Sequence, residues 1–240
     1  MDTIKMRHRQ ARLIAHRGLS GLERENTAAA FVAAGNRSYY GIETDVHRTA
    51  DGEFVIVHDD TTGRVTAGAD LPVEETAFAE LRQLRLPDLD GKQREDLCLP
   101  SLAEYLRICK KYDKVAVLEL KNPFPREDIK KIVEIIRKES DLEQVVFISF
   151  SLENCLHLRS LLPEQPIQWL IGREIDETVV ETLVKHKLDL DALYTKLSRK
   201  LVERLHSLGI VVNCWTCNDP AAGEALADMG VDFITTNILE

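Results

Sequence analysis

The sequence predicts an α/β fold in which eight parallel strands close into a barrel surrounded by helices. Short runs rich in β-branched residues alternate with helical patterns along most of the chain, as in repeated βα units. Several of these runs are apolar throughout, which is typical of parallel strands covered on both faces. The length of 240 residues suits one such barrel, which typically takes about 250 residues.

The chain contains nine runs that are predicted as strands, one more than the barrel needs. They cover residues 12–16, 41–46, 54–58, 115–120, 145–150, 167–171, 191–195, 210–216 and 231–235. Helical patterns lie between most of them, at residues 27–36, 102–112, 126–138, 152–162, 177–186, 199–208 and 220–229. The alternation predicts that each helix connects two parallel strands.

The extra strand is explained by a hairpin after the second run. Only a few residues separate Val46 from Phe54, whereas a parallel crossover needs about a dozen or more. Residues 54–58 should therefore return antiparallel, through the turn signal Asp51-Gly52. If these two residues form the whole loop, Asp45 lies opposite His58 and on the same face.

Residues 59–99 interrupt the βα rhythm. The segment is rich in turn residues, among them Gly63, Pro72 and Pro87, with one short helical candidate at residues 74–84. We interpret it as a cap inserted after the second barrel strand and lying over one rim. A segment of about 40 residues is too small for an independent core. The expected organisation is thus one barrel domain, residues 1–240, with 59–99 as a small cap.

Composition restricts the partners. The formal net charge is -9, which argues against nucleic acid or an anionic membrane as the main partner. No apolar run approaches the ~20 residues of a membrane-spanning helix, so stable membrane insertion is not expected. The cysteines number five, an odd count, and the polar start lacks a signal-peptide core, so we expect a cytoplasmic protein. The oligomeric state is open, a homo-oligomer included.

Polar side chains gather where the predicted strands end, at the rim that carries the chemistry of α/β barrels. Glu43 and Asp45 are two residues apart in one strand and should point to the same face. Glu119 and Lys121 have the same spacing at the end of the next barrel strand. The full set is His16, Arg17, Glu43, Asp45, His58, Glu119 and Lys121.

These residue types together suit cleavage of a phosphodiester. Three carboxylates offer the oxygen ligands that a hard divalent cation such as Mg²⁺ or Ca²⁺ prefers, whereas zinc would more often recruit the histidines. Without a cation, the neighbouring anions would raise one another's pKa values. Arg17 and Lys121 supply fixed positive charge for an anionic substrate. His16 and His58 remain as an acid/base pair that works near neutral pH.

Each part of this set, taken alone, also has a structural interpretation. A histidine at a strand end is often structural, and Glu43 with Asp45 could form a solvated strand end or part of an ion pair. Glu119 and Lys121 could form a cross-strand salt bridge. The joined constellation favours function. Asn26 is expected to cap the helix that begins near Thr27, with a substrate contact as the alternative.

The chain resembles the glycerophosphodiester phosphodiesterase family through short strings that occur in the same order along nearly its whole length. They are Ile14-Ala15-His16-Arg17-Gly18, Glu25-Asn26-Thr27, Gly41-Ile42-Glu43-Thr44-Asp45-Val46, Thr49-Ala50-Asp51-Gly52, Val57-His58-Asp59, Glu119-Leu120-Lys121, Ser149-Phe150, Trp215-Thr216 and Gly230-Val231-Asp232. The resemblance implies a TIM-type (β/α)8 barrel with an inserted cap and a divalent metal at its mouth. It also implies hydrolysis of small glycerophosphodiesters to glycerol 3-phosphate and an alcohol.

The resemblance also implies roles for individual residues. In the family pattern the substrate's own glycerol hydroxyl attacks phosphorus, and water then opens the cyclic phosphate that forms. Our hypothesis makes His16 the base and His58 the acid of the first step. The implied roles are metal binding by Glu43, Asp45 and Glu119 (Mg²⁺ or Ca²⁺, with Mn²⁺ as a third candidate), acid/base catalysis by His16 and His58, phosphate binding by Arg17 and Lys121, and a substrate pocket at Phe150 and Trp215, for which core packing is the alternative.

Two departures from the family pattern leave the alcohol undefined. Arg24 stands where the family usually has proline, and the segment after His58, residues 60–66, lacks the usual leucine. Two other functions stay open. One is a lyase that releases a cyclic phosphate as its product. The other is a degenerate barrel that binds phosphodiesters without turnover.

Overall fold

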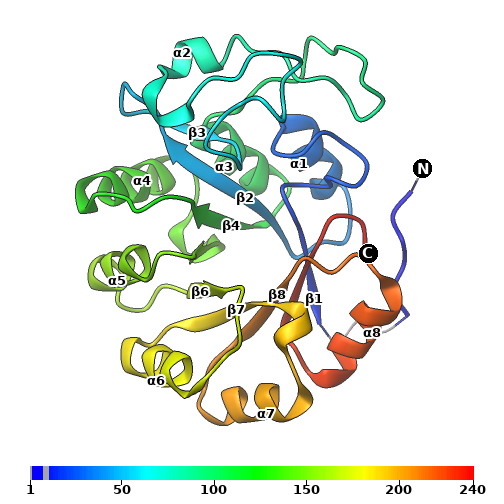
Figure 1. The fold of residues 1–240 in the computed structure, drawn as a ribbon, viewed down its shortest axis with the longest axis vertical. Coiled ribbons are helices and arrows are strands. Elements are labelled where there is room, and N and C mark those ends of the chain that lie inside the picture. The colour runs from blue at the N-terminus through cyan, green and yellow to red at the C-terminus, as the bar shows by residue number, and fades with distance from the viewer. Residues whose placement is uncertain (1, 8–10) are drawn as a thin grey trace.

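The computed structural model describes residues 2–7 and 11–240. Within these residues, eight parallel strands form a closed barrel with helices around it (Figure 1), which confirms the predicted fold class. The barrel strands are β1 (Arg12–Ala15), β2 (Gly41–Arg48), β4 (Val115–Leu120), β5 (Val145–Ser149), β6 (Ile167–Ile171), β7 (Asp189–Leu193), β8 (Val212–Trp215) and β9 (Phe233–Thr236). The short strand β3 (Phe54–Ile56) pairs antiparallel with β2, outside the ring.

The first strand closes the ring. β1 pairs with β2 on one side, where Ile14 lies opposite Gly41, and with β9 on the other, where Ile14 lies opposite Thr235. Because every pair in the ring is parallel, all the strands end at the same rim. The polar residues at the strand ends are therefore brought to one mouth.

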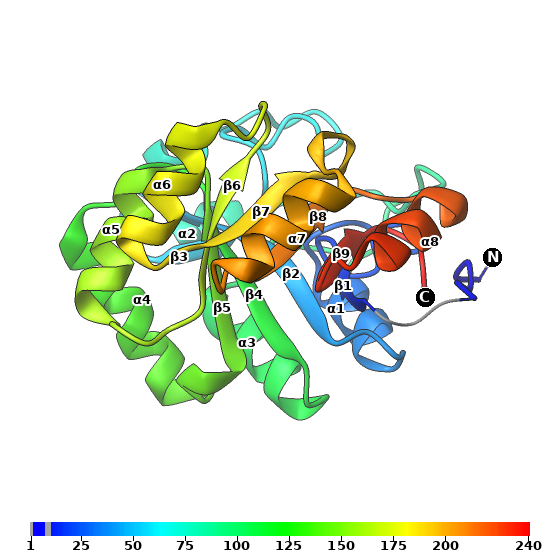
Figure 2. The same cartoon turned by 90° about the horizontal axis from the view of Figure 1, so that it is seen from below.

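Helices cover the outer surface of the barrel, as the second view also shows (Figure 2). Most begin directly after a Ser, Thr or Asp whose side chain accepts a hydrogen bond from the first turn, for example Ser101, which forms a capping box with Glu104. The helices are α1 (Ala28–Gly35), α2 (Phe78–Leu81), α3 (Leu102–Lys111), α4 (Arg126–Glu139), α5 (Leu152–Leu161), α6 (Glu177–His186), α7 (Arg199–Ser207) and α8 (Pro220–Met229). Three short 3₁₀ turns join them among the described residues: η1 (Val73–Glu75), η2 (Leu142–Gln144) and η3 (Tyr194–Lys196).

β2 and β4 form the part of the barrel that carries the acidic residues. Every residue of β4 is buried, and Glu119 is its single ionisable side chain. α3 packs over this pair of strands. Its Tyr105 hydroxyl, fully buried, donates a hydrogen bond to the Ile42 carbonyl at 2.7 Å. The two strands are thus held from outside, while their polar side chains face inward.

The predicted register of the β2–β3 hairpin is wrong by one residue. Asp45 lies opposite Val57, not His58, and the Val57 N–H donates to the Asp45 carbonyl at 3.1 Å. His58 follows the end of β3, and its side chain nevertheless lines the cavity at the barrel mouth.

The register differs from the prediction because the hairpin loop contains three residues, 50–52, and not two. The Thr49 N–H donates to the Glu53 carbonyl at 2.9 Å, so these two residues close the loop. Gly52 takes a φ of +81°, the left-handed conformation that ends a three-residue loop. The Asp51 side chain accepts hydrogen bonds from the Thr49 hydroxyl and the Phe78 N–H.

Residues 59–99 leave the barrel after β3 and form the cyan to teal segment that lies beside α1, α3 and β3 in Figure 1. The helix predicted at 74–84 is wrong, since Thr76 and Ala77 are extended and divide the segment into η1 and α2. The Thr76 carbonyl accepts a hydrogen bond from Ala50 at the hairpin tip, which fixes the extended backbone there. The segment shares a small apolar cluster with β3 and its flank, made of Val55, Val57, Val65, Val73, Leu81, Leu86, Leu97 and Leu99.

The two ends of the described chain lie side by side, with Ile4 bridged to Leu239. Among residues 2–7 and 11–240, no helix is both long enough and apolar enough to cross a membrane.

Candidate active site

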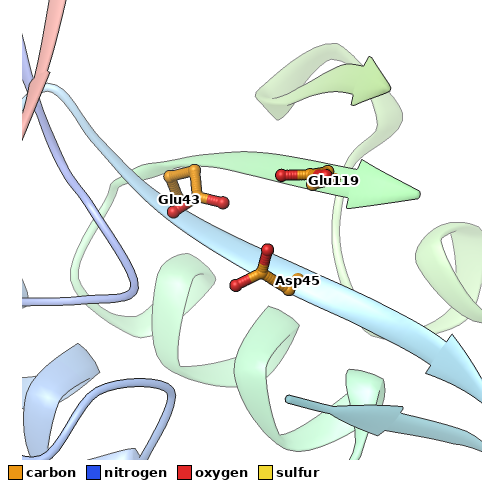
Figure 3. A group of neighbouring side chains, drawn as sticks. All are labelled: Glu43, Asp45 and Glu119. Carbon is orange, nitrogen blue, oxygen red and sulfur yellow. The ribbon is translucent and has the colours of Figure 1, made fainter. Parts of the chain in front are cut away.

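Three carboxylates meet at the mouth of the barrel. Glu43 and Asp45 project from β2 and Glu119 from β4, and one oxygen of each lies within 4.8 Å of the others (Figure 3). Asp45 and Glu119 are directly opposite in the parallel register. All three are buried, with 2%, 1% and 7% of their surfaces exposed. The spacing of two residues along β2 explains why Glu43 and Asp45 share this face.

Burial and mutual repulsion disturb the protonation of this group. Burial, followed by the charges of Asp45 and Glu119, raises the pKa of Glu43 well above its usual value. Burial and the charge of Asp45 raise the pKa of Glu119 to about 7. Burial alone would also raise the pKa of Asp45, but Arg17 and Lys121 hold that pKa below its usual value. The protein's own cations therefore stabilise one of the three anions and leave the other two poorly compensated.

Two cations flank the carboxylates. Arg17 Nε lies 3.6 Å from Asp45 Oδ2, and Lys121 Nζ lies 3.5 Å from Asp45 Oδ1 and 2.9 Å from Glu119 Oε1. Both cations are mostly buried, with side chains 17% and 14% exposed. They place positive charge beside the position where a bound anion would meet the carboxylates.

The loop after β1 places Arg17 through its backbone. Arg17 has a φ of +54°, and its N–H donates to Glu43 Oε2 at 2.8 Å. Gly18 follows with a φ of +75°, and a Cβ there would lie 2.7 Å from the backbone of Ala30. Only glycine allows the loop to pack this closely on α1.

His16 lies beside Glu43, with its Nε2 3.9 Å from Glu43 Oε2. Its Nδ1 lies 2.7 Å from Asn237 Oδ1, an amide oxygen that can only accept a hydrogen bond. The proton of the neutral ring is then on Nδ1, and Nε2 has a free lone pair. Burial and the charge of Arg17 lower the pKa of His16 to about 4.

His58 is held by a carboxylate. Its Nδ1 lies 2.6 Å from Asp59 Oδ1. Burial and the charge of Arg17 lower the pKa of His58, while Asp45 and Asp59 oppose the shift. A carboxylate partner favours the imidazolium form more than an amide partner does, so the two histidines have different environments.

His16, Arg17, Glu43, His58 and Glu119 line a cavity of about 110 Å³, whereas Asp45 and Lys121 are not among its lining residues. Its polar side is lined by His16, Arg17, Glu43, His58, Glu119 and Asp191, and its apolar side by Ile148, Phe150, Leu170 and Trp215. Phe150 and Trp215 pack edge to face with ring centroids 5.5 Å apart. Phe150 is 46% exposed, so it lies at the mouth and is not a core residue.

Asn26 belongs to this site, and its predicted role as a helix cap is wrong. The Thr27 hydroxyl caps α1 by accepting from the Ala30 N–H. Asn26 takes a φ of +54° and turns inward, where its Nδ2 donates to Asp45 Oδ2 at 2.8 Å. Asparagine tolerates this left-handed conformation better than most residues. Its presence directly before Thr27 was therefore the sequence signal that the backbone turns at residue 26.

Glu25 and Arg64 were missed as site residues. Glu25 accepts from Arg17 Nη1 at 2.8 Å and also from Arg64, whose guanidinium in turn reaches Asp59 beside His58. Hydrogen bonds from Arg64 and Arg17 overcome the effect of burial and lower the pKa of Glu25 to about 2. Glu25 and Arg64 are 39 residues apart in the sequence, so spacing could not reveal their pairing.

Asp191 on β7 was also missed. It lines the cavity and is 1% exposed, and its Oδ1 has no hydrogen-bond partner among the described residues. Burial, with the charge of Glu119, raises its pKa well above the usual value. In the sequence, an aspartate within a predicted, mostly apolar strand was the signal that could have marked Asp191 as a candidate site residue.

The residues present fit a hard divalent cation. The three ligands are oxygen donors, and Asp45 Oδ1 is buried without a hydrogen-bond partner among residues 2–7 and 11–240. A cation bound here would lower the raised pKa values of Glu43 and Glu119 by compensating their charge. Two histidines that could transfer protons and two basic side chains that could bind an anion lie beside the three carboxylates. This combination of groups suits phosphodiester cleavage.

Comparisons with known proteins give the same picture. The profile of the glycerophosphoryl diester phosphodiesterase family matches residues 16–240. A glycerophosphodiester phosphodiesterase of Caldanaerobacter subterraneus is 28% identical over 228 residues, covering 94% of this chain and 93% of the relative. The solved structure of an Oleispira antarctica phosphodiesterase in complex with the product sn-glycerol-3-phosphate is 27% identical with a TM-score of 0.85, covering 94% of this chain and 92% of that one. A glycerophosphodiester phosphodiesterase structure from Thermotoga maritima is 27% identical with a TM-score of 0.78, covering 96% of each chain.

Proposed function

The chain belongs to the glycerophosphoryl diester phosphodiesterase family, and we propose that it hydrolyses small glycerophosphodiesters to glycerol 3-phosphate and an alcohol with the help of a divalent cation. Membership makes it a phosphoric diester hydrolase. The observation that carries the proposal is the convergence of His16, Arg17, Glu43, His58 and Glu119 on one cavity. The Oleispira antarctica relative, bound to sn-glycerol-3-phosphate, supports the product.

Glu43, Asp45 and Glu119 would hold the cation, Mg²⁺ or Ca²⁺ with Mn²⁺ as a third candidate. When bound, it would supply Lewis-acid activation of a substrate hydroxyl and neutralise developing negative charge. The support is the cluster of three buried oxygen donors and the raised pKa values of Glu43 and Glu119. Asn26 and Lys121 would keep Asp45 in its place.

Arg17 and Lys121 would bind the phosphate. Both are mostly buried and already lie beside the carboxylates, so they do not need to be desolvated again when an anion arrives. Phe150 and Trp215 would form the apolar wall against which the organic part of the substrate packs. The cap, residues 59–99, would stay part of a single catalytic domain and border the mouth.

In the first step, the glycerol hydroxyl next to the phosphate attacks phosphorus, and the bond from phosphorus to the alcohol oxygen breaks. His16 Nε2 accepts the hydroxyl proton, because its ring is neutral with the proton on Nδ1. His58 gives a proton to the departing alkoxide, because the Asp59 carboxylate supports its charged form. Intramolecular attack also gains from proximity.

In the second step, water opens the cyclic phosphate and restores both histidines. His58 now removes a proton from water, and His16 returns its proton to the glycerol oxygen that leaves phosphorus. The products are glycerol 3-phosphate and the alcohol released earlier. The alcohol leaves the cavity between the two steps, and water takes its place beside phosphorus.

A product assay tests the proposal. Purified protein is incubated with the glycerol 3-phosphate diesters of choline, ethanolamine, glycerol and inositol, with Mg²⁺, Mn²⁺ or Ca²⁺ and with a chelator. Release of glycerol 3-phosphate that stops with chelator is expected. Phosphorus NMR distinguishes the lyase alternative, in which the cyclic phosphate accumulates as the end product. Release unaffected by chelator would refute the metal, and no turnover of any diester would leave the degenerate barrel as the better description.

A further inference from the structure

Arg64, the sixth residue of the cap, is the centre of a network that ends on two of the proposed active-site residues. Its Nη1 and Nη2 donate to the two oxygens of Glu25 at 2.9 and 2.8 Å. Its Nε and Nη2 donate to the two oxygens of Asp59 at 2.5 and 3.0 Å. One guanidinium thus makes two bidentate contacts, the geometry for which arginine is specifically suited.

Each of these carboxylates holds a residue of the site. Asp59 Oδ1 lies 2.6 Å from His58 Nδ1, and Glu25 Oε1 accepts from Arg17 Nη1 at 2.8 Å. The order of contacts is therefore Arg17, Glu25, Arg64, Asp59 and His58. Asp59 and Arg64 belong to the cap, whereas Arg17 and Glu25 lie in the loop after β1 and His58 follows β3.

We infer that Arg64 is a positioning residue that orients His58 through Asp59 for proton donation to the leaving alcohol, an inference that rests on the proposed function. The ionised Asp59 carboxylate can only accept a hydrogen bond, so it accepts the Nδ1 proton of the His58 ring. The proton given to the alcohol is then the Nε2 proton of the charged ring, and the neutral ring that remains keeps its proton on Nδ1. Asp59 is part-exposed and joined to the backbone by a short side chain. Arg64 donates hydrogen bonds to both oxygens of Asp59. It thereby fixes the orientation of the Asp59 carboxylate, which in turn orients the His58 ring.

The contribution of Arg64 should appear in turnover more than in stability. Its side chain is 46% exposed, and those of Asp59 and Glu25 are 28% and 17% exposed. Ion pairs with this much solvent contact add little to the stability of the fold. Orientation of a proton donor, in contrast, affects the rate directly. Hydrogen-bond partners that orient metal-binding histidines are typically worth about 10–100-fold, and we expect the same scale for Arg64.

Arg94 provides a matched control. It also lies in the cap and forks between acidic residues, with bonds to Glu23 at 3.1 Å, Asp88 at 2.9 Å and Asp96 at 2.7 Å. Like Arg64, it joins the cap to the loop after β1. Within the described part of the chain, none of these three carboxylates forms a hydrogen bond or ion pair with His58 or Arg17. Loss of Arg94 therefore removes a comparable cap contact without disturbing the proton donor.

The experiment compares leaving groups that differ in their need for a proton. Wild type, Arg64→Ala, Arg64→Lys and Arg94→Ala are assayed for kcat and KM on glycerophosphocholine and on the 4-nitrophenyl diester of glycerol 3-phosphate. The choline alkoxide must be protonated as it leaves, whereas 4-nitrophenolate leaves without a proton. For Arg64→Ala we expect kcat on glycerophosphocholine to fall by about 10–100-fold and kcat on the nitrophenyl ester by less than about 3-fold. Arg64→Lys should lie between, because it keeps the charge and loses the fork.

Arg94→Ala should match wild type on both substrates. Equal losses on the two substrates for Arg64→Ala, no loss on either, or the same pattern in Arg94→Ala would each overturn the inference. Melting temperatures of the variants identify a loss caused by unfolding, and Arg64→Lys then gives the deciding comparison. A wild-type protein that cleaves neither diester would overturn the proposed function itself, which is a different outcome.

Discussion

At the scale of single residues, the site is organised by unequal compensation of charge. Asp45 contacts both Arg17 and Lys121 and has a lowered pKa, whereas Glu43 and Glu119 have raised pKa values. The same inequality separates the two histidines, because His16 has an amide partner and His58 a carboxylate partner. Neighbouring groups of one chemical type thus acquire different roles from their partners.

The two histidines should be essential and separable from stability. Replacement of His16 or His58 by alanine is expected to lower kcat by about 10²–10⁴-fold, because each transfers a proton in the proposed mechanism. His206→Ala is the control, since His206 also pairs with an aspartate, Asp232 at 2.9 Å, but on the outer surface of the barrel. Steady-state kinetics with cation present measures the effect. Near wild-type turnover in both site variants would contradict the mechanism.

Glu119 should give the cation-free protein a distinctive pH dependence. Its folded-state pKa is raised from the usual 4.5 to about 7, so the folded chain binds its proton more tightly than the unfolded chain. The resulting stability is fully present below pH 4.5 and is lost as the pH rises through about 7. In Glu119→Gln, the melting temperature in chelator should therefore fall less between pH 5 and 8 than in wild type.

Added Mg²⁺ or Ca²⁺ should raise the melting temperature of wild type more at pH 8 than at pH 5, because the ligands must be deprotonated. The Glu119→Gln protein should respond less. Glu181→Gln, a change at an exposed position of α6, serves as control and should follow wild type. Identical pH profiles for Glu119→Gln and wild type would show that Glu119 does not carry the raised pKa.

At the scale of elements, loops and strand ends place the functional groups, while the strands provide a rigid frame. Arg17 and Asn26 both adopt left-handed backbone conformations in the loop after β1, and both contact Asp45. The β2–β3 hairpin presents His58 through a three-residue turn whose last residue is Gly52. These positions depend on backbone angles that few residue types adopt.

Gly52 should be a test of this hairpin. Gly52 has a φ of +81°, and among the described residues beyond its chain neighbours only Arg48 Nη2 lies within 4 Å of an added Cβ, so alanine there meets backbone strain and almost no steric contact. We expect Gly52→Ala to cost about 1 kcal/mol of unfolding free energy. Gly52→Asn should cost less, because asparagine tolerates the left-handed region. Urea unfolding measures both, and an alanine variant as stable as wild type, or more stable than the asparagine variant, would refute the predicted strain.

At the scale of the whole molecule, cap and barrel share apolar packing. Val55 on β3 packs with Leu81, Leu86 and Leu97 of the cap, although this cluster is separate from the main core. Ser101, at the start of α3, also pairs with Val55 in a β-bridge. Loss of the cap would expose apolar residues of the hairpin, which supports the proposal of one domain.

Replacing a large side chain of the cap's apolar cluster by alanine should therefore destabilise the barrel as well. Leu86 is fully buried, and Leu86→Ala is expected to cost about 2–5 kcal/mol. Trp169 and Trp215 both belong to barrel strands, so their fluorescence reports barrel unfolding. The unfolding midpoint measured by tryptophan fluorescence should fall together with the midpoint measured by far-UV circular dichroism. Leu89→Ala, at a cap position 53% exposed, should change neither. An unchanged tryptophan transition in Leu86→Ala would show that the cap unfolds independently.

The sequence by itself determined the barrel and the main parts of the site. Strand and helix periods are local properties, so eight barrel strands and the helices between most of them could be recognised before any contact was known. The spacing of Glu43 with Asp45, and of Glu119 with Lys121, predicted shared faces for the same reason. Apolar strands with a few charged residues at their ends indicated which rim carries the chemistry.

Only the tertiary structure decided the partners of these groups. The hairpin register depended on one extra loop residue, and a shift of one residue changes which side chains oppose each other. The contacts of Asn26 with Asp45, and of Arg64 with Glu25, join separate segments and require the closed ring and the packed cap. Such contacts follow from chain geometry in three dimensions, which has no counterpart in local periodicity. The same holds for Asp191, whose place in the cavity depends on closure of the barrel.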